Sequence, residues 1–90
     1  MRRTCDPQRL KEEILSIVES LDQPRLAAFY SSHTVNEILE RLYAAWEDRG
    51  RAGEPLDYAD CEELERLLDE ARRASRTPLW AAFRKLLGRE

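Results

Sequence analysis

The chain has 90 residues, of which 42% are hydrophobic and 37% are charged, and its formal net charge is −3. This length fits one domain, and seven aromatic side chains with this hydrophobic content are too many for a disordered chain. No apolar run approaches the ~20 residues that span a bilayer, and the basic N-terminus leads into no apolar segment typical of secretory signals. We therefore expect a single domain over residues 1–90, without a membrane span.

The basic residues and the cysteines indicate origin and location. Arginines outnumber lysines by 13 to two, which favours a GC-rich bacterial or phage genome. Cys5 and Cys61 lie 56 residues apart and do not form a disulfide framework in the sequence. Cys61 shares an apolar stripe with Leu64 and Leu68, so we expect a buried structural thiol rather than a reactive one. These features predict a cytoplasmic protein.

Helical periodicity dominates the first third of the chain, and no strand-like alternation is present. A helix is expected from about Pro7 to Leu21, with Asp6 as its N-cap. Its apolar residues recur with the period of a helix, whereas Leu15 lies off that stripe and indicates a second contact. A break at 22–24 is followed by a short helix that ends near Tyr30.

Three further helices are predicted. The third begins at Thr34, which forms a capping-box pattern with Glu37, and ends before Gly50. On it, Glu37 and Arg41 are spaced as an i, i+4 ion pair. The fourth helix begins at 57 or 60, and the fifth covers about 78–88 after a cap at 77.

These segments predict an all-α fold: a compact bundle of four to five short helices. Residues 6–49 and 57–88 form two halves joined by the loop 50–56, which holds two of the three glycines. Residues 6–29 and 60–83 match at six of 24 positions. This offset of 54 is explained either by two similar helical hairpins or by two uses of the same capping chemistry.

Residues for catalysis or metal binding do not converge in the sequence. His33 is the single histidine, and it lies in a turn between two helices, beside Ser31 and Ser32. The chain lacks C-x-x-C and H-E-x-x-H patterns, Asp-rich calcium loops and glycine-rich phosphate loops. We therefore expect no enzyme, no metal and no cofactor. An enzyme or redox protein that uses His33 or Cys61 is the rival reading.

Charge is divided unevenly along the chain. Residues 71–90 have a net charge of +5, and residues 1–70 have a net charge of −8. The basic end docks on the acidic body, complements the helix dipoles, or contacts an anionic partner such as nucleic acid. Because the chain as a whole is acidic, nucleic acid is the less favoured partner. The residues for an anionic contact are Arg72, Arg73, Arg76, Lys85 and Arg89.

One segment resembles a known family. Leu26-Ala27-Ala28-Phe29-Tyr30-Ser31, followed by Leu39 and Leu42-Tyr43, is similar to part of the haemolysin-expression-modulating (Hha/YmoA) family. The resemblance covers about 18 residues, with about one helical turn fewer between its two elements and two additional helices after it. It implies a helical co-regulator that acts beside a nucleoid protein, and it transfers no functional residue.

The combination of missing catalytic groups and abundant aromatic residues predicts a small protein–protein interaction module. It would act as a bacterial or phage regulator, adaptor or inhibitor, and its partner would be another protein or a second copy of the chain. The alternative is a nucleic-acid-associated co-regulator that acts through the basic C-terminal end. Tryptophan, tyrosine and arginine dominate binding hot spots. The expected partner-binding residues are therefore Tyr30, Tyr43, Trp46, Trp80 and Arg84.

Overall fold

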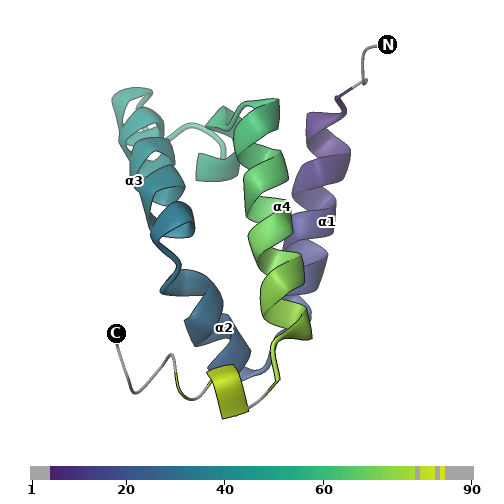
Figure 1. Ribbon diagram of the computed structural model, residues 1–90. Coiled ribbons are helices and arrows are strands. Elements are labelled where there is room, and N and C mark those ends of the chain that lie inside the picture. Colours follow the sequence, from purple (N-terminus) through teal and green to yellow (C-terminus); the bar gives the residue numbers. More distant parts are fainter. Residues whose placement is uncertain (1–4, 79, 83, 85–90) are drawn as a thin grey trace.

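The computed structural model describes residues 5–78, 80–82 and 84, and within this part of the chain it contains helices and no strand. This confirms the predicted all-α class. Figure 1 shows how the helices are arranged. The elements, in chain order, are α1 (Pro7–Ser20), α2 (Gln23–Tyr30), α3 (His33–Asp48), the 3-10 helix η1 (Pro55–Tyr58) and α4 (Cys61–Arg76).

Aspartate caps start three of the helices α1 to α4. Asp6 accepts a hydrogen bond from the Arg9 backbone N–H, which confirms the predicted start of α1. Asp22 caps α2 in the same way. Asp60 and Glu63 form a reciprocal capping box at the start of α4, which decides between the two predicted starts in favour of residue 60. Such caps satisfy backbone donors that the first helical turn leaves unpaired.

The predicted cap of the third helix is wrong by two residues. Ser32, rather than Thr34, caps α3 by accepting a hydrogen bond from the Val35 backbone N–H. The expected ion pair between Glu37 and Arg41 is also wrong. Glu37 lies 3.1 Å from His33, whereas Arg41 reaches across to Glu63 of α4. A longer-range partner therefore outcompetes the local one.

The segment expected as a plain loop ends in a short helix that the sequence did not predict. Gly50 and Gly53 both have φ of +73°, and Arg51 has φ of +63°, so three residues adopt the left-handed region before η1 begins. A Cβ on Gly53 would lie 2.9 Å from a carboxylate oxygen of Asp57, so this position lacks room for a side chain as well. Glycine avoids both penalties.

Helix α4 is the central element. It packs against α1, α2 and α3, while η1 packs against α3. Helices α1 and α4 run in the same direction, and α3 runs in the opposite direction (Figure 1). The largest fully buried side chains come from α3 and α4, and the core they form extends to α1 and α2. Its members are Ile14, Phe29, Val35, Ile38, Leu42, Leu64, Leu67, Leu68, Ala71 and Ala74.

The expectation that the two cysteines are unpaired is wrong. Cys5 and Cys61 form a disulfide with their Cα atoms 6.3 Å apart, within the usual range for such bonds. The pair lies where the parallel helices α1 and α4 begin, so a separation of 56 residues in sequence becomes a direct contact. Sequence spacing did not reveal this contact because it depends on the parallel arrangement of the two helices.

The structure describes part of the helix that the sequence predicts at the C-terminal end. Residues 80–82 and 84 are helical, whereas the rest of the predicted helix at 79, 83 and 85–88 lies outside the described residues. No helix in the described part of the chain has the length and apolar character required to cross a bilayer.

Candidate functional site

An apolar groove of about 240 Å³ lies between α1 and α3. Leu15 and Val18 of α1 line one wall, and Leu39 of α3 lines the other. Buried Leu67 of α4 lies at the base. The two wall helices both pack on α4 and have no comparable packing with each other, which leaves the space between them open. Leu15, which the helical pattern set apart from the main stripe, therefore faces this groove.

Two tyrosines lie at the mouth of the groove. Tyr30 and Tyr43 both line it and remain 48% and 51% exposed, so about half of each side chain faces water. Phe29 packs edge-to-face on Tyr30, with ring centroids 5.1 Å apart, and this contact fixes the Tyr30 ring. The structure thus brings together two of the five aromatic or basic residues that the sequence predicted for partner binding.

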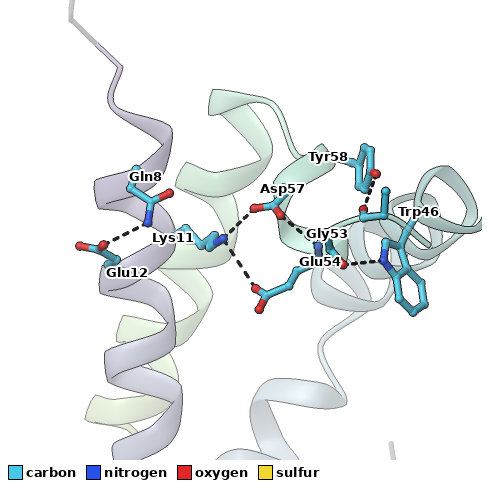
Figure 2. A network of polar contacts seen from close by, with 9 residues as sticks. Gln8, Lys11, Glu12, Trp46, Gly53, Glu54, Asp57 and Tyr58 are labelled. Atoms are coloured by element: carbon cyan, nitrogen blue, oxygen red, sulfur yellow. Dashed lines mark hydrogen bonds and ion pairs between the residues drawn. The ribbon is translucent and has the colours of Figure 1, made fainter. Parts of the chain in front are cut away.

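A polar network joins α1 to η1 and to the residue before it (Figure 2). The Lys11 ammonium lies 2.6 Å from Asp57 and 3.6 Å from Glu54. Asp57 also accepts a hydrogen bond of 3.0 Å from the Glu54 backbone N–H. Residues 54–56 contribute to the groove lining, so this network positions part of the groove wall.

The same network shifts two pKa values in opposite directions. The hydrogen bond from Lys11 lowers the pKa of Asp57 below its ordinary value, and the backbone donor at Glu54 adds to the effect. The hydrogen bond to Asp57 raises the pKa of Lys11. Both groups therefore stay charged throughout the neutral range, and the link between α1 and η1 persists there.

Acidic side chains flank the groove. On α3, Glu40 and Glu47 stand three residues before and four residues after Tyr43, so they lie on its face of the helix. On α1, Glu19 stands four residues after Leu15 and is exposed. Glu54 lies in the lining with Lys11 3.6 Å away, and Glu47 pairs with Arg51, so the carboxylates of Glu19 and Glu40 contribute most of the negative charge at this border. Such a border favours a ligand that carries positive charge beside an apolar group.

Trp46 does not line the groove and instead supports a neighbouring turn. Its ring N–H donates a 2.9 Å hydrogen bond to the Gly53 carbonyl, and the Arg51 guanidinium lies 5.6 Å from its ring centre. The half-buried indole thus supports the turn that leads into η1 (Figure 2). Its edge-to-face contact with Tyr43, at 5.9 Å between centroids, connects this support to the groove mouth.

The other predicted anchor, Trp80, lies away from the groove lining and is 66% exposed. The Arg84 guanidinium lies 5.9 Å from the centre of the Trp80 ring, a cation–aromatic arrangement. Together they form an exposed apolar surface that carries a positive charge, which we call the Trp80–Arg84 knob.

The predicted anionic-partner residues are not gathered into one described patch. Arg72 lies 3.2 Å from Glu13 of α1, and Arg73 lies 3.6 Å from Glu70. Arg76 is exposed at the end of α4. Lys85 and Arg89 lie outside the described residues. The pairing of Arg72 with α1 agrees with the view that the basic end docks on the acidic body.

His33 and Cys61, the two groups of the rival catalytic reading, do not line the groove. His33 is 88% exposed at the side chain and pairs with Glu37 on the surface. Cys61 is held in the disulfide. No cluster of three or more histidine, cysteine or acidic residues suited to a metal ion occurs among the described residues.

Comparisons of this chain with protein-family models, with curated proteins and with solved structures find no match. The resemblance to the Hha/YmoA family therefore rests on the short segment from Leu26 to Tyr43 alone. The groove between α1 and α3 is the feature from which a function is argued.

Proposed function

We propose that this protein is a non-enzymatic protein–protein interaction module that binds its partner in the groove between α1 and α3. One observation carries the proposal: two half-exposed tyrosines stand at the mouth of an apolar groove that the fold leaves open. Tyrosines in such positions bury large areas at low entropic cost when a partner binds. The partner feature that fits is an apolar side chain on a segment with basic residues.

The bordering carboxylates support this choice over a nucleic-acid ligand. Glu19 and Glu40 would repel phosphates, whereas they would attract the basic residues of a protein segment. The predicted roles of regulator, adaptor or inhibitor and the bacterial or phage origin belong to this proposal.

A cytoplasmic location also belongs to the proposal, and the disulfide provides its test. In a reducing compartment Cys5 and Cys61 would be recovered as thiols, whereas an oxidising compartment would maintain the bond. Alkylation of the protein during cell lysis, followed by mass measurement, separates the two cases. A cytoplasmic location requires the dithiol form.

The test of the function is capture of a partner that depends on the groove. The 90-residue chain, in the redox state in which it is recovered from cells, is used as bait with lysate from a bacterial host, with nuclease and at two salt concentrations. Tyr43→Glu places a charge in the groove mouth and is expected to remove the captured partner. Ala44→Glu adds the same charge to the adjacent exposed position of α3 and is expected to retain it.

Both variants alter exposed positions, and their circular dichroism spectra should match that of the wild type. A partner captured equally by both variants would show that binding lies elsewhere. A partner lost on nuclease treatment would favour the nucleic-acid alternative and its arginines at 72, 73 and 76. Binding lost only with Tyr43→Glu supports the groove.

A further inference from the structure

The groove and the Trp80–Arg84 knob have complementary chemistry on the same chain. Trp80 is the most exposed of the large hydrophobic side chains in the described residues, and Arg84 adds a positive charge next to it. The groove is apolar, opens between two tyrosines and is bordered by carboxylates. We propose that the partner in the groove is a second copy of this chain, which inserts its Trp80–Arg84 knob; this inference rests on the proposed function.

The size of the groove suits the knob. An apolar cavity of about 150 Å³ accepts a benzene molecule. The groove has about 240 Å³, which provides room for the two-ring side chain of tryptophan. Burial of a tryptophan removes about 150–250 Å² from water, so Trp80 is a strong candidate for the anchor of such a contact.

Opposite charges at the two ends of the sequence also favour contact between two copies. Residues 1–70 have a net charge of −8, and residues 71–90 have a net charge of +5. Docking the basic end of one copy beside the acidic groove of another places opposite charges together. Because these charges are close to the surface, salt should weaken the contact.

A knob and a groove on each chain allow a two-fold dimer with two reciprocal contacts. Trp80 does not line the groove of its own chain and remains exposed, so its side chain is available to the groove of a second copy. Each protomer then contributes one knob and one groove. Two reciprocal contacts predict that a variant without the knob and a variant with a blocked groove can still form one contact with each other, which a single shared patch does not predict.

The experiment is sedimentation equilibrium on the oxidised 90-residue chain over a wide concentration range. The wild type is expected to form a concentration-dependent dimer. Trp80→Ala removes the knob and Tyr43→Glu blocks the groove, and each is expected to weaken dimerisation by about 30-fold or more, the scale of a hot-spot residue. Ala44→Glu is the control and should dimerise like the wild type.

The decisive arm mixes the two defective variants. Tyr43→Glu retains its knob and Trp80→Ala retains its groove, so one of the two contacts can form between them. The mixture should therefore associate more strongly than either variant alone, which a misfolded variant would not achieve. A wild type that stays monomeric at all concentrations, or a mixture with no gain, overturns the dimer. If the groove captures a different protein in the lysate experiment, the dimer proposal is overturned while the proposed function stands.

Discussion

Loss of the Cys5–Cys61 bond is expected to destabilise the fold substantially. The bond closes a loop across the 56-residue separation, and the cross-link restricts the unfolded chain throughout that loop. The chain-entropy relation gives about 4 kcal/mol at 25 °C for a loop of this length, and native disulfides typically contribute 2–4 kcal/mol. A domain of this size has a free energy of unfolding of about 5–15 kcal/mol, so the bond supplies a large share of it.

The assay is urea denaturation followed by far-UV circular dichroism, on the wild type and on a variant with Cys5→Ser and Cys61→Ser. The variant is expected to unfold at a clearly lower urea concentration, with a free energy of unfolding reduced by about 2–4 kcal/mol. Reductant should lower the wild-type midpoint to that of the variant. The variant itself contains no thiol and should not respond to reductant.

Equal midpoints would refute the reasoning, provided that mass measurement shows the wild type to be oxidised. In that case the cross-link would not restrict the unfolded chain, or the ends of α1 and α4 would separate before the rest of the fold unfolds. A variant that loses helix content before any urea is added would instead show a larger contribution than the loop-closure relation gives.

Three further outcomes are expected. Asp57→Asn should lower the free energy of unfolding by about 0.5–1 kcal/mol at neutral pH. Because the pKa of Asp57 is lowered and that of Lys11 is raised, this difference between variant and wild type should fade as pH falls below 3.8 or rises above 10.5, which a pH series of denaturation curves measures. Gly53→Ala should lower the thermal midpoint more than Gly50→Ala, since both positions have positive φ, which costs about 1–2 kcal/mol, but only Gly53 would also meet a carboxylate; equal shifts would contradict this account. Leu42→Ala, at a fully buried site, should reduce the free energy of unfolding by about 2–5 kcal/mol, and a loss near zero in urea denaturation would show that the core can close around the gap.

The helices could be predicted because their signals are local. Asp6, Asp22 and Asp60 each precede an apolar period and cap a helix through a neighbour three residues ahead. The capping residue of α3 was predicted wrongly, because the capping-box pattern pointed to Thr34, whereas Ser32, two residues earlier, accepts the hydrogen bond from the Val35 backbone N–H. Asn36 donates hydrogen bonds to the carbonyls of residues 30 and 32, which extends the junction between α2 and α3.

The groove could be predicted only in part, because its walls come from segments far apart in sequence. Tyr30 and Tyr43 are aromatic residues of the kind that favours interfaces, and Leu15 is an apolar residue off the main stripe of its helix, so these three positions carry a signal in the sequence. The contribution of η1 was missed, since it depends on the contact between Lys11 and Asp57, which are 46 residues apart. The disulfide was missed for the same reason, and Trp46 proved to support a turn through its ring N–H.

The disulfide also determines what happens when a protease cuts the exposed turn between α3 and η1. Arg49 and Arg51 are exposed there and are suitable for trypsin. Cys5 lies before the cut and Cys61 lies after it, so both fragments remain covalently joined. The cleaved chain would keep its mass on a non-reducing gel, apart from one added water, and would separate into two bands after reduction. It would therefore behave as a two-chain protein whose halves are held together at the start of α1 and α4.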